Sequence, residues 1–119
     1  MNDETESTWR KETDFLSQNV GDLSTVAFLA KTLADENRLR ILLALSTGKK
    51  SVSVVVGELS LSQPLVSHHL KELRRALLVK VERSGPFVYY ELSDPRILDI
   101  MEGLCHLGQE LLATQTIFK

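Results

Sequence analysis

Apolar residues recur with a helical period over five stretches of the chain and with a period of two over one further region. The helical spacing predicts helices within residues 9–20, 22–33, 35–47, 63–76 and 95–113. Residues 78–83 and 87–92 alternate instead between apolar and polar positions, and Ser84-Gly85-Pro86 lies between them. This pattern predicts a β-hairpin. Residues 1–8 are polar, and we expect them to be frayed.

The predicted helices carry recognisable start and stop residues. Asp35 is a good N-cap, because its carboxylate can accept a backbone N–H one turn into the helix, and Gly48 is expected to end that helix. The helix within 63–76 has its apolar residues at spacings of four, three and four, which predicts one buried stripe. The stripe consists of Val66, Leu70, Leu73 and Leu77.

The segment 51–60 is ambiguous from local propensity. Its sequence, SVSVVVGELS, is rich in valine, which favours strands, and Gly57 is a poor helix former. Pattern alone therefore leaves helix and strand open for this segment.

Two helices joined by a short turn and followed by a hairpin are the order of a winged helix-turn-helix. We expect a mainly α fold with a small β-hairpin, of about five to six helices plus a two-stranded wing, in a single domain over residues 1–119. The helix-turn-helix would occupy 51–76 and the wing 78–93. The helix at 95–113 is too apolar to stay uncovered in so small a domain. We expect it, with the helix at 9–20, to form a homodimer.

Composition fits one globular domain, with 43% hydrophobic and 25% charged residues among 119. The net charge of −2 argues weakly against a nucleic-acid partner. Its distribution reverses that argument. Residues 62–85 carry five Lys or Arg and two acidic side chains, whereas residues 1–14 and 86–119 each carry two basic and five acidic ones. Local charge governs a phosphate contact, because screening acts within about 8–10 Å.

The basic block coincides with the second helix of the predicted helix-turn-helix, whose N-terminal residues face base edges in such motifs. The base-facing candidates are Gln63, Ser67 and His68. Phosphate contacts are expected further along the helix, at Lys71, Arg74 and Arg75. Arg83, near the tip of the hairpin, could reach an adjacent groove or the backbone. His69 is expected to pack inward, about 100° from His68 on the helix.

The segment from Leu33 to Leu92 resembles the ArsR/SmtB family of bacterial winged-helix repressors. The resemblance is carried by LADENRLRILLAL (33–45), LSQPLVSHHLKELRRALLV (61–79) and VYYEL (88–92). It implies that 51–60 is a helix and that the base-facing candidates match positions that touch bases. It also implies a homodimer whose recognition helices enter successive major grooves of a pseudo-palindromic operator, with release by an inducer.

The chain departs from that family at Leu77, where the family usually has glycine closing the recognition helix. A side chain with a Cβ resists the left-handed cap conformation, so we expect this helix end to be built differently.

The metal-sensing positions of the family are altered as well. At the arsenic-type site, Ser51 and Ser53 stand where cysteines are expected, and hydroxyls do not replace thiolates for a soft ion. At the zinc-type site Asp94 and Glu110 match, but two histidines are replaced. Arg96 and Leu107 occupy their positions.

We therefore expect neither metal site and no cofactor. The remaining metal candidates are Glu102, Cys105, His106 and Glu110, of which the carboxylates and the histidine are spaced by four on one helix face.

No sequence pattern of an enzyme is present, and the single cysteine excludes an internal disulfide. The polar N-terminus and the short apolar runs are untypical of a signal peptide or a membrane span, so we expect a cytoplasmic protein without a membrane partner. The expected function is sequence-specific binding of double-stranded DNA by a homodimeric repressor whose inducer is unknown. The alternative is a winged-helix protein-interaction module without sequence-specific DNA binding.

Overall fold

The computed structural model describes residues 13–114, so the expectations for residues 1–8 and for Trp9 lie outside the described residues. The chain forms two compact units that divide between Lys31 and Thr32. In the first unit, residues 13–18 are helical, followed by the 3₁₀-helix η1 (Val20–Asp22). Helix α2 (Leu23–Leu33) follows, and its last two residues, Thr32 and Leu33, belong to the second unit and are buried.

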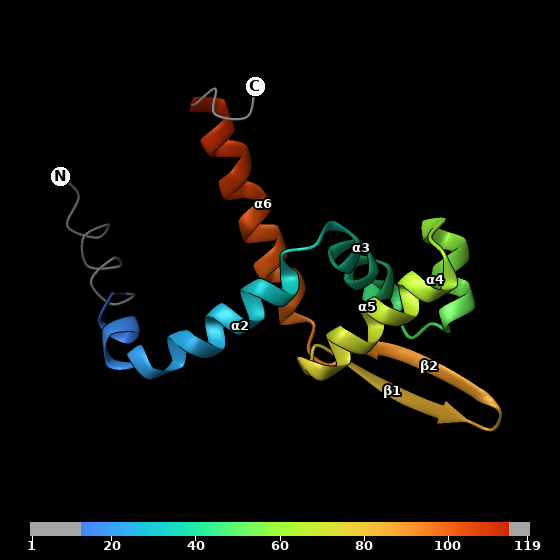
Figure 1. Ribbon diagram of the computed structural model, residues 1–119. Helices are drawn as coiled ribbons and strands as arrows, with labels where there is room; N and C mark the ends of the chain where they lie inside the picture. Colours follow the sequence, from blue (N-terminus) through green and yellow to red (C-terminus); the bar gives the residue numbers. More distant parts are fainter. Residues whose placement is uncertain (1–12, 115–119) are drawn as a thin grey trace. The chain divides into compact units, whose positions relative to one another are not determined.

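The second unit contains the helices and the hairpin expected of a winged helix-turn-helix. Helix α3 (Glu36–Ala44) runs into the 3₁₀-helix η2 (Leu45–Thr47), which ends before Gly48. Helices α4 (Val52–Leu59) and α5 (Gln63–Arg75) precede strands β1 (Val79–Ser84) and β2 (Phe87–Leu92), and α6 (Arg96–Thr114) closes the described chain. In Figure 1 the hairpin extends from the end of α5, with its turn pointing away from α6.

The valine-rich segment is a helix, as the family resemblance implied and local propensity did not. Ser51 caps α4, because its side-chain oxygen accepts the backbone N–H of Val54 at 3.3 Å. Val55 faces the interior and is fully buried. Tertiary packing therefore outweighs the strand preference of the four valines.

The hairpin is joined by a two-residue loop. Ser84 pairs with Phe87, and Gly85 between them has a φ of 61°, which a type II′ turn requires at its first position. A third segment extends the sheet locally. Lys50 exchanges two backbone hydrogen bonds with Tyr90, at 2.9 and 2.8 Å, so the residue preceding the helix-turn-helix is bonded to the wing.

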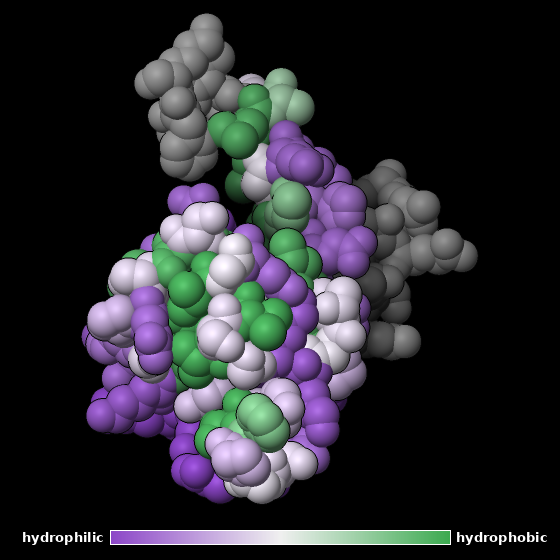
Figure 2. Space-filling view, turned by 90° about the vertical axis from the view of Figure 1, so that its right-hand side faces the viewer, coloured by the Kyte–Doolittle hydropathy of each residue, from purple (hydrophilic) through white to green (hydrophobic). Residues whose placement is uncertain are grey.

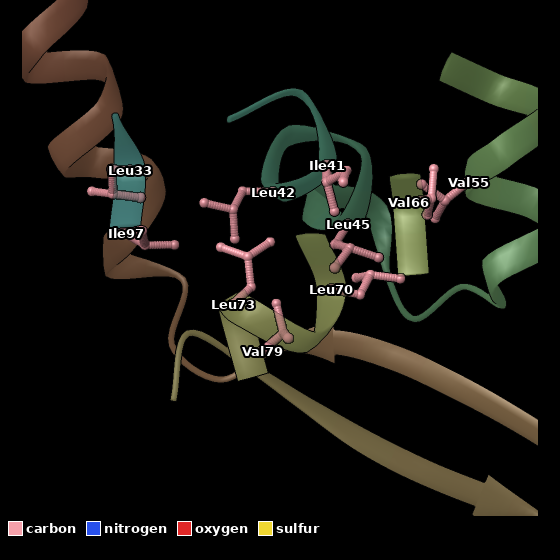
Figure 3. Packing of buried hydrophobic residues seen from close by; sticks show 10 residues of the cluster. All are labelled: Leu33, Ile41, Leu42, Leu45, Val55, Val66, Leu70, Leu73, Val79 and Ile97. Atoms are coloured by element: carbon pink, nitrogen blue, oxygen red, sulfur yellow. The ribbon is translucent and has the colours of Figure 1, made fainter. Parts of the chain in front are cut away.

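One hydrophobic core holds the second unit together (Figure 3). Helix α5 contributes three fully buried side chains from one face, as the stripe predicts: Val66, Leu70 and Leu73. They pack with α3, α4 and the start of β1, through residues that include Ile41, Leu42, Leu45, Val55 and Val79. Burying a side chain of this size stabilises the fold by about 1.5–3 kcal/mol, so the recognition helix is anchored along its whole length.

The end of α5 corrects two sequence expectations about Leu77. Leu77 adopts the left-handed region, with a φ of 62°, although it is not glycine. The N–H of Leu78 donates to the carbonyl of Leu73 at 3.0 Å, and the N–H of Leu77 to that of Arg74 at 2.9 Å. These are the two bonds of a Schellman motif, so the helix ends in the way that glycine would end it.

Leu77 is also absent from the buried stripe. Its side chain is 79% exposed, because α5 stops two residues earlier and the left-handed turn swings this side chain off the apolar face.

Helix α6 is anchored only by its first turns. Ile97 is buried and Met101 half-buried, but Leu104, Leu107 and Leu111 are each more than half exposed. Apolar surface also appears as patches bordered by hydrophilic residues on the side that carries α4 and the hairpin turn (Figure 2). Within residues 13–114, no helix combines the length and the apolar character that crossing a bilayer would need.

Candidate nucleic-acid interface

The helix-turn-helix is built from α4, a three-residue turn and α5. Ser60 ends α4 in the left-handed region, with a φ of 54°, which turns the chain sharply. Ser62 then caps α5 by accepting the N–H of Leu65 at 3.3 Å, and Pro64 lies in the first turn, where its missing N–H costs nothing. This local chemistry makes Gln63 the first residue of the second helix.

The exposed face of α5 carries all six candidates that the sequence placed on it. They lie within about 140° of helix surface at 3.6 residues per turn, opposite the buried stripe. They are Gln63, Ser67, His68, Lys71, Arg74 and Arg75, and each is exposed. The structure thus brings base-reading and phosphate-binding side-chain types together on one rigid surface.

Most of these side chains are uncommitted. Within the described part of the chain, Gln63, Ser67, Lys71 and Arg74 make no side-chain hydrogen bond or ion pair to another residue. Arg75 differs, because its guanidinium lies 3.3 Å from the carboxylate of Glu72. That pair is exposed and therefore weak, so Arg75 can exchange it for a phosphate at little cost.

The wing candidate is placed on β1, one residue pair from the hairpin turn. Arg83 is exposed and pairs across the hairpin with Val88. Its guanidinium has no carboxylate partner among residues 13–114, whereas Lys80 lies 3.6 Å from Glu91. Arg83 is thus a wing cation that an external anion can contact without breaking an ion pair.

His68 and His69 are adjacent in sequence but occupy different environments. His68 is exposed on the same side as the candidate residues, and its ring lies 5.4 Å from that of His69. His69 is 5% exposed, as the sequence predicted. Its Nδ1 accepts a hydrogen bond from Nε of Arg38 at 3.1 Å, and its Nε2 lies 3.8 Å from the carboxylate of Asp35.

These contacts tie α5 to the start of α3. Arg38 also donates to the carbonyl of Thr32 at 3.3 Å, and Asp35 caps α3 by accepting the N–H of Arg38 at 3.1 Å. Burial lowers the pKa of His69 below its ordinary value of 6.5 and Arg38 acts in the same direction, against the attraction of Asp35. The cap hydrogen bond lowers the pKa of Asp35. His69 is therefore neutral at pH 7.

Sequence reasoning missed the polar contacts that position the motif. Arg40 donates to the carbonyl of Leu59 at 3.1 Å, which satisfies one of the free carbonyls at the end of α4. Lys50 lies 2.7 Å from Glu58 on α4, with only 16% of the lysine side chain exposed. A helical pattern predicts only that such charged residues face solvent. No sequence pattern would therefore have found these partners.

Of the two carboxylates that match the zinc-type pattern, Asp94 is engaged. Asp94 accepts the backbone N–H of Arg96 at 2.9 Å and a two-pronged contact from its guanidinium, the shorter at 2.8 Å. The hydrogen bond from the Arg96 side chain is the main cause that lowers the pKa of Asp94. Among the remaining metal candidates, Glu102 lies 3.4 Å from His106, and Cys105 is exposed. Across residues 13–114, no three His, Cys, Asp or Glu side chains are grouped so that they could hold a metal ion.

Comparison with known proteins assigns this arrangement to a family. Residues 35–81, which include the helix-turn-helix, match the model described as "Bacterial regulatory protein, arsR family". The HTH-type transcriptional repressor SmtB of Mycobacterium tuberculosis is 36% identical over 91 residues, which are 76% of this chain and 67% of the relative. This chain belongs to the ArsR family.

A further relative and a solved structure extend the match. The arsenic resistance transcriptional regulator ArsR1 of Pseudomonas putida is 33% identical over 107 residues, covering 87% of this chain and 84% of that protein. A solution structure of the homodimeric winged helix-turn-helix DNA-binding domain of Mb0332 from Mycobacterium bovis is 25% identical. It covers 76% of this chain and 84% of that one, with a TM-score of 0.67. The fold is thus a winged helix-turn-helix, and membership makes this chain a transcriptional regulator.

Proposed function

We propose that this ArsR-family chain is a repressor that binds a pseudo-palindromic DNA operator as a homodimer. The observation that carries the proposal is the exposed face of α5. Four side chains suited to bases and phosphates stand there without a partner among the described residues, on a helix that three buried side chains anchor. A face of this kind, on the second helix of a helix-turn-helix, fits the major groove.

The residue roles follow from position along α5. Gln63 begins the helix, where its amide can pair with both N6 and N7 of adenine, and Ser67 and His68 lie one turn later. Lys71 and Arg74 lie further along the helix, where a cation meets the backbone of the duplex. Arg83 extends this positive surface to the wing.

The homodimer is supported by exposed apolar surface on α6. Leu104, Leu107 and Leu111 lie on one face of this helix at 58%, 51% and 51% exposure. The structural neighbour from M. bovis is homodimeric. Covering these leucines with a second copy would remove them from water, and it would place two recognition helices on one DNA site.

The roles of the α5 residues are tested by comparing a selected operator duplex with random duplex DNA. We expect Gln63→Ala and Ser67→Ala to reduce the preference for the operator by about 1–3 kcal/mol and to leave random binding unchanged. We expect Arg74→Ala to weaken both duplexes alike and to reduce the salt dependence of binding, because it removes a phosphate contact.

The matched control is Arg96→Ala, which removes an equal charge at the start of α6 instead of from α5. It is expected to change neither affinity. Equal affinity of the wild-type protein for operator and random DNA at every salt concentration would contradict the proposal and favour the protein-interaction alternative.

We also propose that the arsenic-type and zinc-type sites of the family do not bind metal ions in this chain. The Ser51 hydroxyl is engaged in capping α4, and Asp94 is engaged by Arg96. We expect zinc, cadmium and arsenite at micromolar concentrations to leave operator affinity unchanged, as measured by fluorescence anisotropy. Release of the DNA by any one of the three ions would contradict this part.

A further inference from the structure

The buried contact between His69 and Arg38 sits where the DNA-reading helix meets the rest of the unit. His69 lies on α5 between Ser67 and Lys71, on the opposite face of the helix. Its partners are on another element, because Arg38 and Asp35 belong to the start of α3. A change in this contact therefore acts on the placement of α5 from its buried side, and among the DNA-facing candidates the ring of His68 lies 5.4 Å from that of His69.

The hydrogen bond requires a particular protonation state. Nε of arginine always carries its hydrogen, so Nδ1 of His69 must offer a lone pair at 3.1 Å. A proton on Nδ1 would place two N–H donors against each other and an imidazolium beside a guanidinium in a site that is 5% exposed. The protonated ring cannot keep its present place beside Arg38.

Asp35 does not relieve this conflict. Its carboxylate lies 3.8 Å from Nε2 of His69, beyond a hydrogen bond, and the same oxygen already accepts the N–H of Arg38. Movement of Asp35 towards an imidazolium would weaken the cap of α3. The other titratable group near the ring, His68, adds repulsion when it is charged.

We propose that His69 and Arg38 are positioning residues for α5, and that protonation of His69 displaces this helix and weakens DNA binding. The inference rests on the proposed DNA-binding function. Operator binding then selects the neutral ring. Since each bound protomer must release one proton from a protonated His69, affinity is expected to fall by about tenfold per pH unit and protomer once the pH lies below the pKa of that ring.

The first experiment follows the histidine rings of the free protein by NMR from pH 7.5 to 4.5, with circular dichroism to confirm folding. The chain has three histidines, so the signals can be assigned with single His→Asn variants. Anisotropy of a labelled duplex, selected from a random library by the protein itself, gives affinity over the same range. The loss of affinity is expected below pH 6.5, at the midpoint of His69.

Two variants move that midpoint in opposite directions. Arg38→Met removes the neighbouring positive charge and the N–H that the ring accepts, so the His69 pKa should move to higher pH while the loss of affinity at low pH becomes smaller. Asp35→Asn removes the neighbouring negative charge but keeps a capping side chain, so the His69 pKa and the loss of affinity should both move to lower pH. A purely structural role would change affinity in both variants without the paired shift in Asp35→Asn and without the weaker pH dependence in Arg38→Met.

His69→Asn keeps an acceptor near the position of Nδ1 and does not titrate. The affinity of this variant for DNA should therefore not fall at the pH where His69 of the wild-type protein becomes protonated. His106→Asn is the matched control, and its loss of affinity is expected to persist. His68→Asn addresses the opposite effect, because a charged His68 near phosphates would raise affinity at low pH.

The inference is wrong if His69 protonates in the folded protein with no change in affinity, or if it stays neutral to pH 4.5. If the chain binds no DNA at any pH, the proposed function is wrong. The role of His69 and Arg38 in positioning α5 can then still be tested in the free protein. Hydrogen-exchange protection of the α5 amides is then expected to drop when His69 protonates, and unchanged protection would overturn the positioning role as well.

Discussion

Leu77 occupies a backbone region that suits glycine best. Its φ of 62° places the Cβ close to the following carbonyl, at a cost of about 1–2 kcal/mol for a residue other than glycine or asparagine. The mostly exposed side chain recovers little of this by burial. The buried face of α5 and the two Schellman hydrogen bonds impose the conformation, so the residue carries local strain in an otherwise well-packed helix end.

Replacing Leu77 by glycine should therefore stabilise the protein. We expect Leu77→Gly to raise the free energy of unfolding by about 1 kcal/mol, because the strain is removed and little buried surface is lost. Urea denaturation measures the change. Leu77→Ala keeps the Cβ and should show little or no gain, and an alanine variant as stable as the glycine variant would contradict the explanation.

Sequence predicts single residues well where one physical rule decides their placement. The cap at Asp35 and the buried residues Val66, Leu70 and Leu73 of α5 follow from capping and from helical period. The conformation of Leu77 does not, because a local preference was outweighed by packing that only the folded chain supplies. The contact from Arg38 to His69 spans 31 positions, and no periodicity encodes it.

At the scale of elements, hydrogen bonds and an ion pair of Lys50 connect α4 to the wing. Lys50 is bonded to Tyr90 of β2 through its backbone and to Glu58 of α4 through its side chain. One residue thus joins the hairpin to the first helix of the helix-turn-helix. Local propensity left α4 open between helix and strand, because the neighbours that bury Val55 lie elsewhere in the chain.

A double-mutant cycle with Lys50→Met and Glu58→Gln should reveal this tie. We expect a coupling energy of about 0.5–1 kcal/mol, because the lysine side chain is mostly buried and the pair is short. Thermal and urea unfolding of the four proteins give the value.

The chain offers a control of the same chemistry. Lys49 and Glu82 lie 3.2 Å apart with 44% and 47% of their side chains exposed, so their coupling should be close to zero. Similar coupling in both pairs would show that burial does not set the strength.

At the scale of the whole molecule, charge and apolar surface are separated along the chain. The basic residues of 62–85 map to α5 and the wing, whereas α6 carries acidic residues and exposed leucines. This division was predictable from sequence, because it depends on counts and spacing. The sequence also predicted that a second copy of the chain covers α6, and this stays a prediction.

Charging the apolar face of α6 should separate the proposed dimer. We expect Leu107→Lys to give a monomer in sedimentation analysis and to lower operator affinity on the order of a hundredfold, because the two half-sites are then bound independently. Gln109→Lys, on the polar side of the same helix, should remain dimeric. A dimeric Leu107→Lys protein would place the interface elsewhere.

The uncommitted face of α5 has a consequence for how this protein can change over generations. Within the described residues, the side chains of Gln63, Ser67, Lys71 and Arg74 are exposed and make no hydrogen bond or ion pair, so replacing them is expected to cost little stability. The requirements for folding and for reading a DNA sequence fall on opposite sides of one helix. A lineage, or an engineer, can therefore redirect the protein to a new operator without first repairing its fold.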